Sequence, residues 1–350
     1  MFKRKTIRYI PIEEMNERLR YCATHRNIVM GAKPSDKPFG LNAYIEDKQV
    51  KFSLSYKYGG VSCTYVCRKD GAEQLEDVDG FTAFNTLSKY YKVPDMTKDK
   101  SVCNELQWSE QANKFLYSAK PLLYKNPKYE GTRNDAIGYD LNSSYPYAML
   151  KDMPDTSVPY HAGFVKEGEI GFERDGDEGS LTPKFKGFSF FIFPLMESPF
   201  KRFVEHWYSE KKSGNVRAKG MLNFSVGYLQ RINPFLRATI IYYANLEISK
   251  LIDENTLYCN TDSIVSLTPR DLTIGKELGN FKIEHQGKFA YKNFNYQWDY
   301  DTPSYRGISK KWFKPGWDIL KDPIPQNGNI VKYENYQLVE VSYGIKSKKK

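Results

Sequence analysis

The stretch DAIGYDLNSSYPYAML, residues 135–150, decides the fold of this 350-residue chain. Its first half is rich in strand-forming residues, and its second half carries the Ser, Tyr and Pro that are typical of a helix start. Ser143 or Ser144 can cap the helix, and Pro146 suits its first turn. Asp140 therefore lies where a strand turns into a helix. A carboxylate in that position suits a metal ion or a phosphate group.

A second carboxylate has a similar setting downstream. Asp262 lies between two β-prone runs, TLYC and SIVSL, which predict a hairpin with residues 260–263 at its tip. If the hairpin pairs with the strand that carries Asp140, the two aspartates converge. Two convergent aspartates on a rigid sheet can bind a pair of Mg²⁺ ions, one activating a hydroxyl and one steadying a leaving oxygen.

A basic helical stretch lies between these two carboxylates. In KKSGNVRAKGMLNFSVG, residues 211–227, Lys219 and Asn223 are four positions apart and share one helix face, with Lys212 at helical spacing from them. Such a face could clamp the phosphates of a nucleoside triphosphate. The alternative is a solvated helix face with no ligand.

The composition favours a nucleic-acid partner. Lys and Arg number 52 against 42 Asp and Glu, for a formal net charge of +10, and 15% of the residues are aromatic. Cations track phosphates and ring faces stack on bases, although a basic soluble protein without nucleic acid has the same composition. No run of eighteen apolar residues and no signal-peptide core is present, so we expect a soluble, intracellular protein with no membrane partner.

The cysteines do not predict a disulfide framework. There are five, an odd number in a chain this long. Cys22 and His25 could be combined with Cys63 and Cys67 into a four-ligand zinc site, but neither pair has the context of a zinc knuckle. We therefore expect no zinc.

Periodicity predicts a mixed α and β chain. Strands are expected over residues 41–68, with Gly59-Gly60 as a turn, and over 187–196; roughly the last seventy residues are strand-like as well. Helices are expected in the following ranges: part of 7–28, 81–91, 109–123, 203–230 with a break near Ser213-Gly214, and 234–255.

In their order along the chain, these pieces resemble the polymerase core of family B DNA polymerases, most closely the protein-primed branch of phages and linear plasmids. DLNSSYP (140–146) resembles motif A, D-x-N-S-x-Y-P. Lys219, Asn223 and Gly227 resemble motif B, K-x-x-x-N-x-x-x-G, and YCNTDS (258–263) resembles motif C, Y-x-D-T-D-S. LGNFKIE (278–284) resembles the segment that leads into the thumb. The resemblance covers roughly residues 125–300.

The resemblance implies an α+β fold: a polymerase palm with an antiparallel sheet, helical fingers and a small thumb, together with an N-terminal α/β region. The implied divisions are 1–120 for the N-terminal region, 121–200 and 235–270 for the palm, 201–234 for the fingers, and 271–350 for the thumb and a basic tail.

The resemblance also implies template-directed DNA synthesis on a primer-template with deoxynucleoside triphosphates and two Mg²⁺ ions, with Mn²⁺ as a substitute. Asp140, Asp262 and the Leu141 carbonyl would ligate the metals. Nucleotide-binding roles fall to Tyr145, Lys211, Lys219, Asn223 and Gly227, and accessory roles to Ser143, Asn260, Thr261 and Ser263. Tyr145 would lie beneath the incoming sugar and exclude a 2′-hydroxyl. A terminal protein or another priming partner, and the cytoplasm of a bacterial cell infected by a phage, follow from the same branch.

Several positions depart from the family pattern. Asn260 replaces the first aspartate of motif C, Val226 stands where Tyr is usual, and Phe224 stands where Ser is common. No D-x-E exonuclease signature precedes Asp140, so a reduced polymerase without proofreading is expected. Two alternatives stay open: a catalytically silent DNA-binding or assembly module, and a primase-like or template-independent nucleotidyltransferase.

Overall fold

The protein is described here from a computed structural model. It describes residues 80–299 apart from 130, 177–178 and 293–294, residues 304 and 318–322, and the backbone of seven further strands. The predicted turn at Gly59-Gly60 and three members of the zinc candidate, Cys22, His25 and Cys63, lie outside the described residues.

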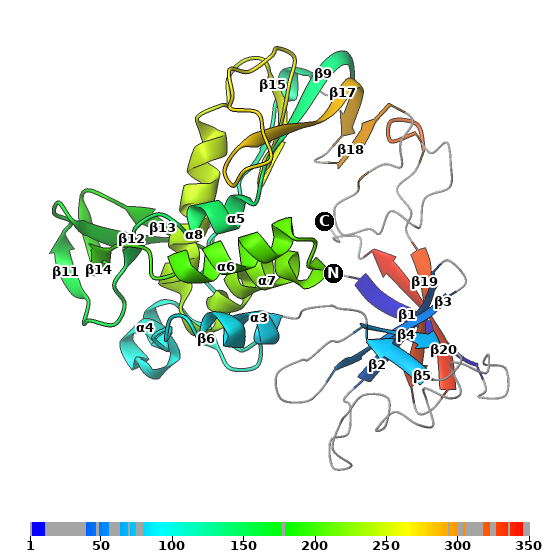
Figure 1. Cartoon of the computed structure of the whole chain (residues 1–350), viewed down its shortest axis with the longest axis horizontal. Coiled ribbons are helices and arrows are strands. Elements are labelled where there is room, and N and C mark those ends of the chain that lie inside the picture. Colours follow the sequence, from blue (N-terminus) through cyan, green and yellow to red (C-terminus); the bar gives the residue numbers. More distant parts are fainter. Residues whose placement is uncertain are drawn as a thin grey trace.

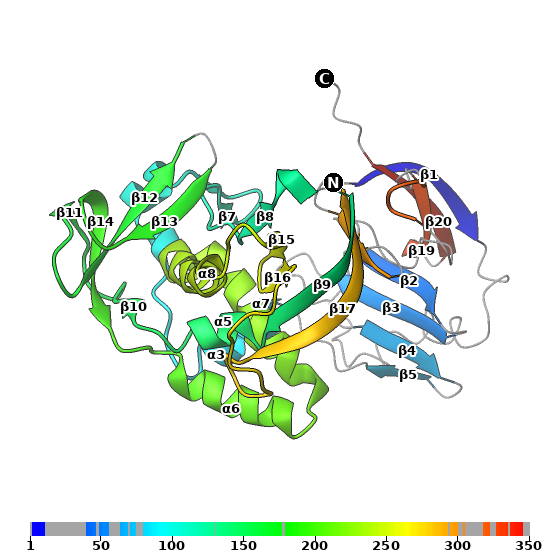
Figure 2. The same ribbon diagram turned by 90° about the horizontal axis from the view of Figure 1, so that it is seen from above.

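A six-stranded antiparallel sheet carries the stretch that opens the sequence analysis. Its strand order is β18-β17-β9-β16-β15-β8, with β9 in the interior of the sheet. The strands are β8 (Leu123–Lys125), β9 (Gly131–Leu141), β15 (Thr256–Asn260), β16 (Ser263–Ser266), β17 (Phe281–Lys292) and β18 (Asn295–Trp298). The predicted strand that ends near Asp140 and the predicted hairpin are both confirmed. Figure 2 shows β9 and β17 as a long twisted pair.

The side chains of β9 point alternately to the two faces of this sheet, and an apolar cluster covers each face. Ile137, Tyr139 and Leu141 enter one apolar cluster together with Cys259 and Ile264. Ala136 enters the cluster on the opposite face, which contains the aromatic residues Tyr258, Phe289, Tyr291 and Trp298. Asp140 is in the same alternation as Ala136, at the end of the strand. Burial on two faces fixes the register of β9, since a one-residue slip would exchange the two sets.

Three helices follow one another beside the sheet: α6 (Lys201–Lys212), α7 (Val216–Ile232) and α8 (Pro234–Ser249). The predicted break near Ser213-Gly214 is confirmed. Gly214 adopts a left-handed φ of 92°, and the Asn215 side chain then accepts a hydrogen bond from the Arg217 N–H at 3.0 Å, which caps α7. None of the helices in the described part of the chain has the length and apolar composition needed to cross a membrane.

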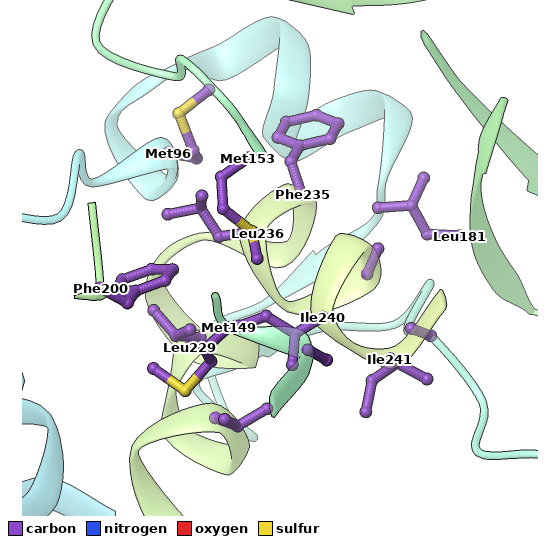
Figure 3. Packing of buried hydrophobic residues seen from close by; sticks show 14 of the residues in the cluster. Met96, Met149, Met153, Leu181, Phe200, Leu229, Phe235, Leu236, Ile240 and Ile241 are labelled. Atoms are coloured by element: carbon purple, nitrogen blue, oxygen red, sulfur yellow. The ribbon is translucent and has the colours of Figure 1, made fainter. Parts of the chain in front are cut away.

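Helix α8 is the centre of the largest apolar cluster. It is buried for most of its length, and Phe235, Leu236 and Ile240 lie among Met149, Met153 and Phe200 (Figure 3). A five-stranded sheet packs on it through β13, and its other strands surround β14. These strands are β10 (Met153–Pro154), β11 (His161–Phe164), β12 (Glu169–Asp175), β13 (Ser180–Lys184) and β14 (Phe188–Met196).

Residues 80–119 belong to the same cluster. Helix α3 (Gly80–Leu87) packs on α7, where Phe84 contacts the Tyr228 ring at 5.0 Å between centroids. The 3-10 turn η2 (Met96–Lys98) and helix α4 (Lys100–Glu105) follow, and the Asp99 side chain caps α4. The sequence analysis did not predict α4.

The helix predicted over residues 109–123 is wrong. The chain forms two short strands there, β6 (Trp108–Ser109) and β7 (Lys114–Phe115), joined by turns, with Asn113 in a left-handed conformation at φ 46°. Phe115 and Tyr117 are buried, whereas Leu116 between them is 52% exposed. The apolar residues of this segment therefore follow the period of a strand and not that of a helix.

The remaining described strands form a seven-stranded antiparallel sheet, in the order β1-β20-β19-β2-β3-β4-β5. They are β1 (Phe2–Ile10), β2 (Gly40–Glu46), β3 (Gln49–Ser55), β4 (Thr64–Arg68), β5 (Gly71–Gln74), β19 (Asn327–Glu334) and β20 (Gln337–Ile345). The helix predicted within residues 7–28, over IEEMNERLRYCATHRN (12–27), lies outside the described residues. This sheet combines strands of the predicted N-terminal region with strands of the predicted C-terminal segment. Figure 1 shows them in blue and red.

Substitution of Gly138 by alanine is expected to destabilise the six-stranded sheet. An added Cβ would lie 2.7 Å from Trp298 Cζ2, and the Trp298 ring is held against Phe289 at 4.7 Å between centroids. We expect Gly138→Ala to lower the free energy of unfolding by about 1–3 kcal/mol, measured by urea denaturation.

Gly227→Ala is the matched control, because Gly227 lies exposed in α7 and an added Cβ meets nothing within 4 Å. It should leave stability unchanged or raise it by up to about 1 kcal/mol. Equal stability of Gly138→Ala and the wild type would contradict the packing of Trp298 on β9.

Candidate active site

The pairing of β9 with β16 brings the two predicted aspartates together. Ser263 is the register partner of Asp140, and the Leu141 N–H donates to the Asp262 carbonyl at 2.8 Å. Thr261 allows the tight turn into β16 by adopting a left-handed φ of 59°. Both aspartates line one cavity of about 240 Å³.

The cavity is bounded by the ends of these strands and by helices α6 and α7. It contains eight of the residues that the sequence analysis assigned: Asp140, Leu141, Ser143, Tyr145, Lys211, Lys219, Asn223 and Asp262. Five further residues line it: Asn142, Ser144, Leu222, Lys282 and Glu284. Carboxylates from the sheet thus face lysines from the helices and from β17 across a small polar space.

Four predicted site residues do not line this cavity: Gly227, Asn260, Thr261 and Ser263. Asn260 is exposed at the end of β15, where it pairs with Ser263 across the hairpin. Gly227 is exposed on α7, one helical turn beyond Asn223. Their predicted roles have no support from the shape of the cavity.

Asn142 holds the segment that leads into β17. Its side chain donates to the Gly275 carbonyl at 2.6 Å, its N–H donates to the Asn280 carbonyl at 2.9 Å, and its carbonyl accepts from the Gly279 N–H at 3.1 Å. These three bonds tie the end of β9 to residues 275–280. The asparagine of the DLNSSYP stretch therefore has a structural role.

A glycine is required at position 279, where the N–H donates to the Asn142 carbonyl. It adopts a left-handed φ of 82°, and an added Cβ would lie 2.5 Å from the Tyr147 ring. The glycine of LGNFKIE thus allows the backbone to approach helix α5 (Ser144–Ala148), which carries Tyr147. DLNSSYP and LGNFKIE pack directly on each other.

Ser143 is placed differently from the prediction. It occupies the position before α5, but with a left-handed φ of 55°, and neither its hydroxyl nor that of Ser144 caps the helix. The Ser143 hydroxyl instead accepts a hydrogen bond from Lys211 Nζ at 2.7 Å. The left-handed turn directs this hydroxyl to α6, which is incompatible with the extended backbone of an ordinary cap. Pro146 lies in the first turn of α5, as predicted.

Helix α6 is attached to the residue 275–280 segment by two further contacts. The Tyr208 hydroxyl donates to the Lys276 carbonyl at 2.9 Å, and Lys212 pairs with Glu277 at 2.9 Å. Together with the bond from Lys211 to Ser143, these contacts hold the basic end of α6 over the ends of the strands.

Burial shifts the pKa values of both aspartates upward. Burial raises the pKa of Asp262 to about 6, and the nearby Asp140 carboxylate acts in the same direction. Burial also raises the pKa of Asp140, although the hydrogen bond from Lys282 opposes the rise. Two like charges in a partly dry space favour the protonated form. A site of this kind gains most from a bound cation.

The lysines of the cavity respond to the same surroundings. Partial burial lowers the pKa of Lys211, and the positive charges of Lys219 and Lys282 lower it further. Burial would lower the pKa of Lys282, but its hydrogen bonds to Glu284 and Asp140 raise it overall. Three ammonium groups close together form a site for a polyanion.

The sequence analysis did not assign Lys282 and Glu284 to the site. Lys282 Nζ lies 3.0 Å from Asp140 Oδ2 and 2.5 Å from Glu284 Oε1. Both residues are on β17, which pairs with β9, and Lys282 is the register partner of Asp140. The sequence signal that could have indicated them is the alternation in FKIE, residues 281–284, which places Lys282 and Glu284 on one face of a strand.

The donor set fits hard divalent cations such as Mg²⁺, which prefer carboxylate and carbonyl oxygens. Asp140, Asp262 and the Leu141 carbonyl could supply three oxygens. The buried Ser144 hydroxyl, without a hydrogen-bond partner among the described residues, is a further polar group at the cavity. In the described part of the chain no group of three or more His, Cys, Asp or Glu side chains is placed to hold a metal.

Comparison with solved structures finds the same fold in Phi29 DNA polymerase. Its complex with primer-template DNA and incoming nucleotide substrates aligns with a TM-score of 0.54 at 14% identity. Its complex with primer-template DNA alone aligns with a TM-score of 0.52 at 15% identity. Each alignment covers 76% of this chain and 67% of that one. The predicted α+β polymerase fold is thereby confirmed.

The chain spans between about half and two thirds of the length of the Phi29 polymerase structures that it matches. No protein-family model and no curated protein matches the chain.

Replacement of Asp262 by asparagine is expected to stabilise the protein at neutral pH. The native state holds a proton on Asp262 more tightly than the unfolded chain does, where the pKa is near 3.8. The stabilising contribution is therefore complete below pH 3.8 and is lost as the pH rises through about 6. Asparagine carries no charge to bury, so Asp262→Asn should gain about 1–2 kcal/mol of unfolding free energy at pH 7.5.

The measurement is chemical denaturation of both proteins in a metal chelator at pH 7.5 and 4.5, where the difference should shrink. Asp135→Asn is the control, because Asp135 is exposed on β9, the strand that pairs with β16, and does not line the cavity. If Asp262→Asn is less stable than the wild type at pH 7.5, hydrogen bonds to the Asp262 carboxylate outweigh the cost of burying its charge beside Asp140.

Proposed function

We propose that this protein is a template-directed DNA polymerase, which adds deoxynucleotides to a primer 3′-hydroxyl and releases pyrophosphate. The observation that carries the proposal is the cavity in which Asp140 and Asp262 face Lys211 and Lys219. Phosphoryl transfer needs negative groups that hold cations and positive groups that hold phosphates, and this cavity offers both. The polymerase fold supports the same reading.

Asp140, Asp262 and the Leu141 carbonyl are the residues that would hold two Mg²⁺ ions, or Mn²⁺ in their place. The bound ions would supply activation of the hydroxyl and neutralisation of charge on the phosphates. The raised pKa values of both aspartates support this assignment, because a cation would relieve their repulsion.

The helices would bind the nucleotide. Lys211 and Lys219 would contact the triphosphate, and Asn223, one turn beyond Lys219 on α7, would line the nucleotide pocket. Most of the rate enhancement would come from positioning and from fixed positive charge, since the protein supplies no covalent chemistry. Gly227 keeps a predicted role in the shape of the pocket, outside the cavity itself.

Tyr145 would select the sugar. Its ring packs against the large apolar cluster and lines the cavity, and burial raises the pKa of its phenol, so the group is neutral at physiological pH. A packed ring in the lining of the cavity would clash with a 2′-hydroxyl and accept a deoxyribose.

The departures from the family pattern fall outside the cavity. Asn260 is exposed and does not line it, and Val226 is 1% exposed in the apolar cluster. Phe224 is 46% exposed and is likewise absent from the lining. Residues in these places would tune the site without supplying its charges, which is compatible with turnover.

The partners in the proposal are a DNA primer-template and deoxynucleoside triphosphates. The aligned Phi29 structures are complexes with primer-template DNA and with incoming nucleotides. A terminal protein as primer, synthesis without proofreading, and a phage gene acting in the bacterial cytoplasm belong to the same proposal and rest on the sequence motifs alone.

Primer extension tests the proposal directly. We expect a labelled primer on a DNA template to be extended with all four dNTPs and Mg²⁺ or Mn²⁺, and Asp262→Asn to reduce the rate by at least about 10²-fold. Asp135 is exposed on β9 and does not line the cavity, so Asp135→Asn should extend primers like the wild type. Tight DNA binding without extension under either metal, with and without a priming partner, would instead favour the silent module.

Substitution of Tyr145 tests sugar selection. Tyr145→Val should raise the incorporation of ribonucleotides relative to deoxynucleotides by roughly tenfold to a hundredfold, because the obstruction to the 2′-hydroxyl is removed. Tyr145→Phe keeps the ring and should keep the discrimination. Equal use of both sugars by the wild type would favour the primase-like alternative.

The silent module is the second candidate, and Asn260 is the observation that favours it. If the missing carboxylate limits the site, Asn260→Asp should convert an inactive protein into one that extends primers. If wild-type extension is already present, the substitution should change the metal concentration that is required and little else.

A further inference from the structure

Lys282 occupies the place of a cation at the aspartate pair. Strand β17 runs antiparallel to β9 with Lys282 opposite Asp140, and the ammonium lies 3.0 Å from Asp140 Oδ2. Within the described residues it is the one cationic group at ion-pair distance from either Asp140 or Asp262. Lys211 is directed to the Ser143 hydroxyl instead.

Glu284 is a second partner of the same ammonium. Its Oε1 lies 2.5 Å from Lys282 Nζ, and both side chains line the cavity. Lys282 is thus shared between one carboxylate that belongs to the candidate metal site and one that does not. Both side chains are partly exposed, and Lys282 already contacts Glu284, so it can leave Asp140 and keep a carboxylate partner.

The cavity is electrically balanced because of this lysine. Its carboxylates are Asp140, Asp262 and Glu284, and its ammonium groups are Lys211, Lys219 and Lys282. A divalent cation that approaches Asp140 meets a positive charge already in contact with that carboxylate, and like charges a few ångströms apart repel. An ion that binds Asp140 Oδ2 would compete with Lys282 for the same oxygen.

We propose that Lys282 is a resident counter-ion, which competes with divalent cations for Asp140 and withdraws to Glu284 when a metal binds. Lys282 therefore sets the divalent-ion affinity of the site. The inference rests on the proposed function, since it takes Asp140 and Asp262 as the metal ligands, and it adds a residue that controls their occupancy.

Direct metal binding tests the proposal without catalysis. Binding of Mn²⁺ to the full chain at pH 7.5, without DNA or nucleotide, is followed by the electron paramagnetic resonance signal of free Mn²⁺. Lys282→Met keeps the length of the side chain and removes its charge, and it should tighten Mn²⁺ binding roughly tenfold. Lys282→Arg keeps the charge and should bind as weakly as the wild type.

Lys276→Met is the matched control for net charge. Lys276 is exposed in the segment before β17 and does not line the cavity. It should leave the Mn²⁺ affinity unchanged. If Lys276→Met and Lys282→Met raise the Mn²⁺ affinity equally, the effect comes from net charge, and the proposed competition between Lys282 and the metal for Asp140 is wrong.

A double-mutant cycle tests the role of Glu284. Glu284→Gln leaves Lys282 with Asp140 alone and should weaken Mn²⁺ binding. In the Lys282→Met background the same substitution should leave the Mn²⁺ affinity unchanged, because no ammonium remains for Glu284 to bind. A loss that persists in that background would show Glu284 acting on the metal directly and would overturn its role as acceptor of Lys282.

Failure of this inference can be told apart from failure of the proposed function. If Asp140→Asn combined with Asp262→Asn binds Mn²⁺ as well as the wild type, the aspartates are not the metal site and both proposals fall. If binding depends on the aspartates but Lys282→Met leaves it unchanged or weakens it, only the counter-ion is overturned. Unfolding midpoints in the same buffer verify that each variant is folded.

Discussion

The pairing of β9 with β16 is the constraint on which the site depends. It places Asp140 and Asp262, both half-buried, at one end of a sheet whose two faces are both packed. Burial, and after it the repulsion from Asp140, raises the pKa of Asp262, and the packing of the sheet offsets this local cost.

The motif-like stretches combine two kinds of residue. In DLNSSYP the aspartate faces the cavity, whereas Asn142 binds the backbone of residues 275–280 and fixes where β17 begins. In LGNFKIE, Gly279 lets that backbone approach Tyr147, and Lys282 then falls opposite Asp140. The structural residues Asn142 and Gly279 therefore determine where Lys282 lies relative to Asp140.

Local patterns predicted the elements that depend on local rules. The strand into Asp140, the hairpin at Asp262 and the helix break at Gly214 follow from alternation, turn residues and glycine conformation. The segment at 109–123 was misjudged because its burial has a period of two that only packing reveals. Lys282 and Glu284 were missed for a different reason, since the register of β17 against β9 is a long-range property that no local spacing encodes.

Two features of the chain make the surroundings of the aspartates less negative. Asn260 stands where the motif has a carboxylate, and Lys282 brings an ammonium into contact with Asp140. Asn260 is exposed outside the cavity, so its effect on a bound ion is screened by water, whereas Lys282 acts at 3.0 Å within it. Coulomb energy falls with distance and with dielectric screening, so the lysine outweighs the asparagine. The feature that most distinguishes this site from a pair of bare aspartates therefore lies on β17, beyond the motifs from which the site was predicted.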